Sequence, residues 1–248
     1  MPSAQHFSPS IRIGCSGWQY RGWRGDFYPP TLPLNRWFDY YAERFNSVEI
    51  NNSFYRLPEA RTFAAWGRRA PEGFEYAVKA SRYLTHMKRL TDMDRGVGRF
   101  YDSIAPMVES PKLGPVLWQL PDRFARDDER LEHALSNLPP GRHAFELRHP
   151  SWFAEPVWDL LRRYGVAFVL HDDKRRRPTP EVLTADFTYL RFHYGRRGRR
   201  GNYSDSELEE WASRVRALAR EAEVFAYFNN DWEVFAPRNA KRLRALVN

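Results

Sequence analysis

The chain has 248 residues, 42% of them hydrophobic and 16% aromatic, which is enough for one sizeable core and excludes a disordered chain. No apolar run approaches the roughly 18 residues of a membrane span, and the single cysteine excludes an internal disulfide and an all-cysteine zinc site. The net charge of +8 favours an anionic partner without identifying it.

The first ten residues contain neither the basic segment nor the apolar segment of a secretory signal peptide. We therefore expect a disordered or extended lead over residues 1–10 and a cytoplasmic protein with no membrane association. No linker, low-complexity tract or obvious repeat divides residues 11–248, so we expect these to form a single domain. The oligomeric state stays open.

Eight short apolar or β-branched runs, bounded by glycine, proline and polar clusters, have the pattern of strands buried on both faces. We predict strands at residues 11–15, 47–50, 74–80, 115–120, 143–147, 166–170, 187–193 and 223–228.

Helical patterns lie between most of these strands. We predict helices at residues 34–45, 58–69, 92–108, 127–138 and 155–164. A seventh-unit helix should start at the capping box of Ser204 and Glu207, and Pro237 can start a last helix that ends at Val247. The sixth unit has no convincing helix, because residues 177–186 are few and broken by proline.

This alternation of strand and helix predicts an α/β fold, a single (β/α)8 TIM-like barrel, with a doubly wound open sheet as the second possibility. No G-x-G-x-x-G motif follows a strand, and no phosphate-binding loop of the G-x-x-x-x-G-K-[ST] type is present. The sequence therefore predicts no nucleotide cofactor.

Polar residues stand at the ends of the predicted strands, where barrels of this kind carry their chemistry. Because side chains alternate along a strand, three strands should point their polar residues into the barrel: Glu49, Asn51, Glu146, Arg148, Arg191 and His193. Three other strands end in Lys79, Gln119 and Asn229. The sixth strand runs into His171, Asp172 and Asp173, and its pattern leaves open which of these points inward.

The inward set contains charges of both signs, and an isolated charge inside a barrel is very costly. The sequence therefore predicts a paired network at the barrel mouth. One interpretation is that this network has a structural role alone and closes the top of the barrel. Five charged residues from four strands nevertheless converge on the barrel mouth, which favours a functional site: Glu49, Lys79, Glu146, Arg148 and Arg191.

Several motifs recur in an order typical of one family. They are Gly14-Cys15-Ser16-Gly17-Trp18, Val48-Glu49-Ile50-Asn51, Phe54-Tyr55-Arg56-Leu57-Pro58, Glu146-Leu147-Arg148-His149-Pro150-Ser151-Trp152 and Phe228-Asn229-Asn230. With them the chain resembles the YecE-like family, also called domain of unknown function 72, over residues 11–247. The resemblance implies a TIM-like barrel and no established reaction, since the family is functionally unassigned.

Two positions depart from the pattern of that family. Val234 stands where the pattern usually has a glycine soon after the paired asparagines. Tyr194 directly follows His193, where the pattern again usually has glycine. An anion-binding backbone at these two loops is therefore not carried over from the resemblance.

Two basic runs, residues 174–177 and 196–200, follow the sixth and seventh strands and so belong to the same face as the inward polar set. They are either solvated loops or a funnel for a phosphate-bearing ligand or nucleic acid. Aromatic residues in the neighbouring loops either pack over the barrel or stack on a ligand. Among them, Trp18 and Tyr55 are the candidates to face the cavity.

We interpret the chain as a metal-independent enzyme without a cofactor, acting on a phosphorylated or otherwise anionic substrate, although the sequence does not decide that it is an enzyme. Arg148, Arg191 and Lys79 would hold the anion. Glu49 or Glu146 would be the general base and His193 the acid. Further binding residues would be Asn51, Gln119, Asp172, Asn229, Trp18 and Tyr55.

Two other interpretations use the same residues. A metal site can be imagined from Glu49, Glu146, His171, Asp172 and His193, but the interleaved lysine and arginines would repel a cation. The alternative function is a nucleic-acid-binding or nuclease-like protein that uses the basic loops 174–177 and 196–200. A small-molecule enzyme requires a closed cavity, whereas a nucleic-acid binder requires a basic groove beyond the mouth.

Overall fold

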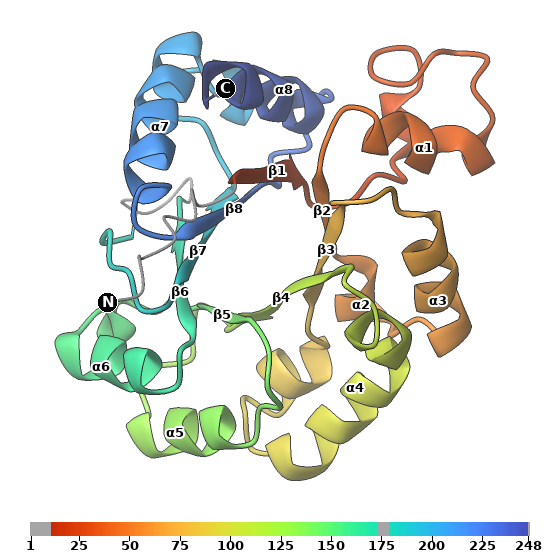
Figure 1. Ribbon diagram of the computed structural model, residues 1–248. Helices are drawn as coiled ribbons and strands as arrows, with labels where there is room; N and C mark the ends of the chain where they lie inside the picture. Colours follow the sequence, from red (N-terminus) through yellow and green to blue (C-terminus); the bar gives the residue numbers. More distant parts are fainter. Residues whose placement is uncertain (1–10, 173–178, 248) are drawn as a thin grey trace, which may run out of the picture.

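The computed structural model of the chain describes residues 11–172 and 179–247. Eight parallel strands form one sheet that curls into a nearly closed barrel, and the helices lie outside it (Figure 1). The predicted (β/α)8 barrel is confirmed, and the open doubly wound sheet is excluded. The predicted lead, residues 1–10, and the first basic run, residues 174–177, lie outside the described residues.

The strands follow one another around the barrel in chain order. They are β1 (Ile11–Cys15), β2 (Ser47–Ile50), β3 (Glu75–Lys79), β4 (Leu113–Gln119), β5 (His143–Glu146), β6 (Ala167–His171), β7 (Phe187–Phe192) and β8 (Glu223–Phe228). All eight lie where the apolar runs predict them, with ends that differ by at most two residues from the prediction.

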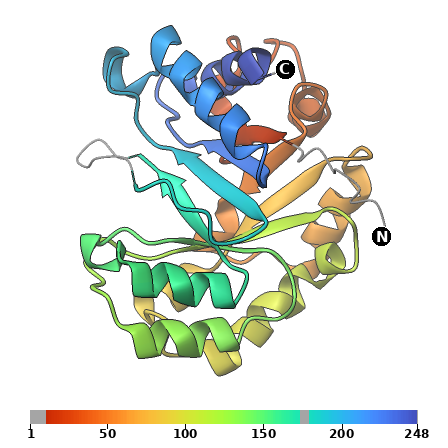
Figure 2. The same ribbon diagram turned by 60° about the vertical axis from the view of Figure 1, so that its left-hand side comes forward.

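The outer ring is formed by α1 (Trp37–Ala42), α2 (Asn52–Tyr55), α3 (Ala60–Arg69), α4 (Met93–Val108), α5 (Asp128–Ser136), α6 (Glu155–Arg163), α7 (Asp205–Leu218) and α8 (Phe235–Val247). The capping box forms as predicted: the Ser204 side chain accepts from the Glu207 N–H, and the Glu207 carboxylate accepts from the Ser204 N–H. Figure 2 shows α5 beside α6, and α7 beside α8. Between β6 and β7, the described residues form no helix. Within the described part of the chain, no helix is long and apolar enough to cross a membrane.

The barrel closes between β1 and β2 through side chains, since no ladder pairing joins these two strands in the described part. Asn46 bonds the backbone of Ile13 and Ile11, with both distances 3.0 Å. The Tyr41 hydroxyl accepts from the Cys15 N–H at 2.8 Å and donates to the Ser47 carbonyl at 3.0 Å. These bonds satisfy backbone groups that a regular ladder would pair.

The barrel interior is filled by one apolar layer between two charged ends. The small residues lie on β3, β5 and β6 and are Ala77, Ala144 and Ala167. They face large residues on β7 and β8, which are Phe187, Tyr189, Phe225 and Tyr227. The alternation of small and large side chains fills the barrel without a channel. The charged side chains of the described strands lie toward the two ends of the barrel, whereas the interior layer contributes the Tyr189 and Tyr227 hydroxyls.

The amino-terminal end of the barrel holds an ion-pair ring that sequence reasoning missed. Glu75 accepts from Arg12 at 2.5 Å and from Arg142 at 2.6 Å. Arg142 also reaches Glu223 at 2.5 Å. The members come from β1, β3, the start of β5 and β8, so the ring ties distant strands together at the end opposite the predicted site.

Candidate active site at the barrel mouth

The carboxyl ends of β2, β5 and β7 bring three predicted residues into one buried cluster. Arg191 donates to both oxygens of Glu49, from Nε at 2.8 Å and from Nη2 at 2.6 Å. Its Nη1 donates to Glu146 Oε2 at 2.6 Å. The side chains of all three are 0% exposed. The predicted paired network therefore exists, with Arg191 at its centre.

Glu49 lies on the inner side of this network. It also accepts from the Tyr189 hydroxyl at 2.7 Å. Although burial acts to raise it, the pKa of Glu49 is held below its usual value by the charge and hydrogen bonds of Arg191. Neither Glu49 nor Arg191 is among the residues that line the pocket described below.

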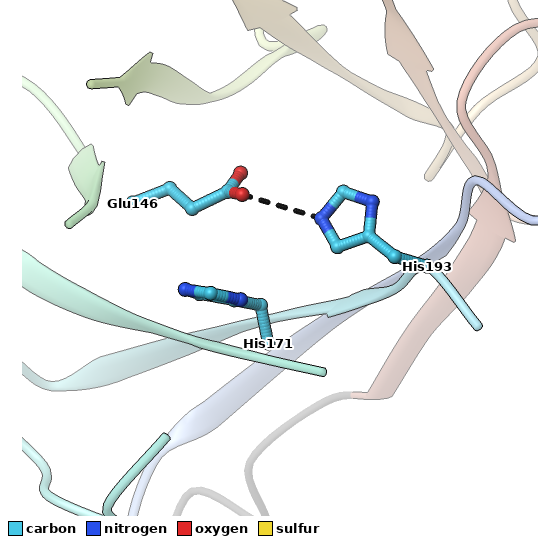
Figure 3. Close-up of side chains that lie close together, drawn as sticks. All are labelled: Glu146, His171 and His193. Atoms are coloured by element: carbon cyan, nitrogen blue, oxygen red, sulfur yellow. Dashed lines mark hydrogen bonds and ion pairs between the residues drawn. The ribbon is translucent and has the colours of Figure 1, made fainter. Parts of the chain in front are cut away.

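Glu146 links the buried network to the pocket. Its Oε2 accepts from Gln119 Nε2 at 2.8 Å, and its Oε1 lies 3.2 Å from His193 Nε2 (Figure 3). Burial opposes ionisation, but the charge of Arg191 and the hydrogen bond from His193 hold the pKa of Glu146 well below its usual value. Asn229 Nδ2 lies 3.1 Å from His193 Nδ1 on the other side of the ring. Burial lowers the pKa of His193, so this imidazole is neutral at pH 7.

Of the two candidates that the structure describes at the end of β6, His171 is the one that points toward Glu146 and His193 (Figure 3), whereas Asp173 lies outside the described residues. The ligand-type atoms of these three side chains lie within 4.8 Å of one another, so they are the described residues that can hold a metal ion. Arg191 already shares the Glu146 carboxylate, and Arg148 Nε lies 3.7 Å from it. These cations oppose a metal ion on electrostatic grounds, and a metal-free site stays our prediction.

A pocket of about 510 Å³ opens above the network. This volume suits a small molecule. Its lining is Phe54, Tyr55, Lys79, Arg82, His86, Gln119, Arg148, His193, Tyr194 and Asn229. Three of these residues are cationic side chains, and none of the described lining residues is acidic. The pocket is therefore an electropositive recess whose floor is bordered by the Glu146–His193 pair.

The two pocket residues that follow β3 have perturbed pKa values. Burial lowers the pKa of Lys79 to about 8, helped by the charge of Arg191. Burial lowers the pKa of His86 to about 4, with a further effect from Lys79 and Arg148. His86 is consequently neutral at pH 7, whereas Lys79 titrates close to neutrality.

Besides Arg191, three predicted binding residues lie outside this pocket: Trp18, Asn51 and Asp172. Trp18 is buried edge-on against Phe38 and Trp66, and with Asn51 it borders a smaller cavity of about 240 Å³. Asp172 accepts from the N–H groups of His193 at 2.7 Å and Tyr194 at 3.2 Å.

Asp172 also accepts from the Tyr203 hydroxyl. Burial raises the pKa of Asp172 to about 6. Through its hydrogen bonds to His193 and Tyr194, Asp172 holds the loop that carries His193, and its side chain is not part of the pocket lining. Tyr55 is 74% exposed at the pocket rim.

The second basic run is partly neutralised by the chain's own acidic residues. Arg197 pairs with Glu210 at 2.7 Å, and Arg200 pairs with Glu233. These pairs reduce the field that the run offers to nucleic acid.

The two departures from the family pattern have distinct local consequences. Val234 has a φ of +61°, in the left-handed region that favours glycine, so the loop keeps a glycine-like backbone at a cost of about 1–2 kcal/mol. Tyr194 adds an aromatic side chain to the pocket lining. A Cβ at Gly201 would lie 2.6 Å from the Tyr194 ring, so Gly201 makes room for it.

Sequence reasoning missed Arg82, His86 and Tyr189. Arg82 and His86 belong to the loop after β3, where a π-helical turn, Tyr83–Met87, brings His86 back over the barrel mouth. The sequence signal for them was their position three and seven residues after Lys79, because the loop after a strand end lies at the barrel mouth. Tyr189 is one alternation step before Arg191 on β7, and the same period-two pattern points it inward.

The fold and the pocket together define a (β/α)8 barrel protein with a polar, cationic recess at the carboxyl ends of its strands. The chain matches the family described as "Protein of unknown function DUF72" over residues 12–248. It therefore belongs to the DUF72 family.

Relatives of this chain share its whole length. UPF0759 protein YunF of Bacillus subtilis (strain 168) is 27% identical, and the match covers 96% of this chain and 95% of that protein. The crystal structure of a DUF72 family protein from Thermotoga maritima MSB8 is 30% identical, with a TM-score of 0.86 over 96% of this chain and 99% of that chain. A DUF72 family protein from Enterococcus faecalis V583 shares the fold at 22% identity and a TM-score of 0.82, over 96% of this chain and 95% of that chain.

Proposed function

We propose that this protein is an enzyme that binds a small anionic substrate, bearing a phosphate or carboxylate, in the barrel-mouth pocket and acts on it by proton transfer. The proposal rests on one observation: three cations, Lys79, Arg82 and Arg148, line the pocket, and the half-buried Glu146–His193 hydrogen bond lies at its edge. Cationic side chains around a recess of this size favour a bound anion.

The protonation states favour His193 as the base and Glu146 as its orienting partner. Glu146 is ionised and accepts from His193 Nε2, which leaves Nδ1 as the nitrogen that can take a proton. When the side-chain amide of Asn229 flips, its oxygen takes the place of Nδ2 and can accept a hydrogen bond from the protonated Nδ1. The carboxylate stabilises the imidazolium that forms, as in hydrolytic triads. The sequence patterns suggested Glu49 or Glu146 as the base and His193 as the acid, so this assignment moves the role of the base to His193.

Phosphate or sulfate is expected to raise the melting temperature of the protein, because an anion that binds the folded state alone stabilises it by about 2.7 kcal/mol at 100 times its dissociation constant. Arg82→Gln and Arg148→Gln should each reduce this shift. Arg95→Gln is the matched control, since Arg95 lines a separate pocket beside α4. Thermal melts with increasing phosphate at constant ionic strength measure the effect.

An unchanged shift in Arg82→Gln and Arg148→Gln, or an equal loss in Arg95→Gln, would contradict anion binding in this pocket. Retardation of oligonucleotides at low salt, abolished by replacing Arg196, Arg197, Arg199 and Arg200 with Ser, would instead support the nucleic-acid alternative. For any anion that passes this test and is turned over, His193→Gln should lose at least about a hundredfold in kcat, the usual scale of general-base catalysis.

A further inference from the structure

Lys79 differs from the other cations of the barrel mouth in its surroundings. It ends β3, is 7% exposed, and lines the pocket. Its Nζ lies 4.2 Å from the centre of the Phe54 ring. Within residues 11–172 and 179–247, no hydrogen bond or ion pair engages this nitrogen. Arg191 and Arg148, by contrast, are each ion-paired to carboxylates. The Lys79 amine is thus buried at the pocket wall without a committed partner.

The choice of lysine at this position is informative in a chain that otherwise uses arginine. The sequence contains five lysines and 34 arginines. A site that only has to hold phosphate or carboxylate is served at least as well by arginine, whose fork binds such groups through two bonds. Lysine differs in that its amine can lose a proton and attack an electrophile. Of the described lysines, Lys79 is the buried one.

The surroundings of Lys79 raise the neutral fraction of its amine, chiefly through burial. Burial lowers its pKa, Arg191 on β7 and Arg148 after β5 lower it further, and Glu49 on β2 and Glu146 on β5 act in the opposite direction. Arg82 and His86 follow on its own loop. With a pKa of about 8, the neutral fraction at pH 7 is roughly two orders of magnitude above that of an ordinary lysine.

We propose that Lys79 is a nucleophile that forms an imine with the carbonyl carbon of an anionic oxo compound, such as an oxo acid or a phosphorylated aldehyde or ketone. This assignment rests on the proposed function, because Arg82 and Arg148 hold the substrate's acid group. It narrows the substrate class from any small anion to one with a carbonyl group near the acid group.

The reaction balances without an added oxidant or reductant. The neutral amine attacks the carbonyl carbon, a nitrogen–carbon bond forms, and one nitrogen proton passes to the oxygen to give a carbinolamine. Loss of the oxygen as water, with the second nitrogen proton, leaves the imine. His193, on the same pocket lining, is placed to carry protons between nitrogen and oxygen. The imine then acts as an electron sink for proton abstraction or bond cleavage at the neighbouring carbon.

Trapping with borohydride tests the assignment in the full-length protein. The protein is incubated with glyoxylate, an anionic aldehyde, or with propanal, a neutral one, and the imine is reduced to a stable secondary amine. Mass spectrometry of the peptides then locates the label among the five lysines. We expect at least about tenfold more label on Lys79 than on exposed Lys88 at pH 7, because burial lowers the pKa of the Lys79 amine to about 8 and the pocket places the bound aldehyde beside it.

Three controls make the outcome decisive. Lys79→Arg should remove the label and retain the phosphate-induced rise in melting temperature, whereas Lys88→Arg should leave labelling of Lys79 unchanged. The pH profile of Lys79 labelling should rise through about pH 8. If Lys79 is labelled no faster than Lys88 while phosphate still raises the melting temperature, Lys79 is not the nucleophile. The proposal that the pocket binds an anion would be unaffected by this result.

The failure of the proposed function gives a different result. Equal labelling of Lys79 by glyoxylate and propanal, with no phosphate-induced stabilisation, would retain the reactive amine and remove the anion site. Preferential labelling of Lys79 by glyoxylate that is lost in Arg148→Gln would support both the nucleophilic lysine and the anion site.

Discussion

Glu49→Gln is expected to lower the free energy of unfolding by about 3–5 kcal/mol at pH 7, the usual cost of breaking a buried ion pair. Glu49 accepts two bonds from Arg191 and one from Tyr189, and none of the charged atoms reaches water. The amide would leave Arg191 with half of its neutralising charge and would turn an N–H group toward guanidinium donors. Chemical denaturation of the two proteins measures the difference.

Glu146→Gln is the matched comparison, because it removes the other carboxylate from the same arginine. The bidentate Glu49–Arg191 pair persists in that variant, and Glu146 belongs to the edge of the pocket. We expect a loss of stability smaller than that of Glu49→Gln, because ionised Glu146 also stabilises the folded protein but accepts one bond from Arg191 where Glu49 accepts two. A loss in Glu146→Gln as large as that in Glu49→Gln would show that Arg191 depends equally on both carboxylates.

The pH dependence of Glu49→Gln has a defined sign. The pKa of Glu49 lies below its usual value of 4.5 in the folded protein, so its contribution to stability is present above that value. It is lost as the pH falls through the lower pKa of the folded state. The gap between the wild-type protein and the variant should therefore be constant near neutrality and should narrow only below about pH 4.5.

Gly14→Ala is expected to destabilise the protein by about 3 kcal/mol or more, because the closure between β1 and β2 has no room for a methyl group. A Cβ at this position would lie 2.0 Å from the Ser47 carbonyl oxygen and 2.7 Å from the Tyr41 hydroxyl. The strands must separate, which adds the loss of the two Tyr41 hydrogen bonds, about 1 kcal/mol each, to an overpacking cost of about 1–3 kcal/mol.

Gly98→Ala is the control for this variant. Gly98 is exposed on α4, and its added Cβ would meet no atom within 4 Å. Alanine in a helix interior should stabilise the protein by about 0.5–1 kcal/mol. Since β2 also carries Glu49, Gly14→Ala should in addition reduce the phosphate-induced shift. A loss below about 1 kcal/mol for Gly14→Ala would show that β1 and β2 can separate without cost.

The local sequence contains most of the secondary structure and the face of each strand side chain. Apolar runs of four to seven residues between turn signals mark all eight strands, and the Ser204–Glu207 capping box marks the start of α7. Period-two alternation points Glu49, Glu146 and Arg191 inward, and the high cost of an unpaired buried charge then demands a network. These inferences succeed because they depend on neighbours within one strand or one helical turn.

Only the tertiary structure decides which charges meet and which side chains reach the pocket. Arg191 finds Glu49 across 142 residues of chain and Glu146 across 45, through the order and closure of the strands. His171 rather than Asp172 faces the network, because β6 continues in register with Arg191 of β7. Arg82 and His86 reach the pocket because a π-helical turn folds back over the mouth. Strand periodicity determines the face of a side chain, whereas its partner depends on the stagger and closure of the whole barrel, which no local pattern contains.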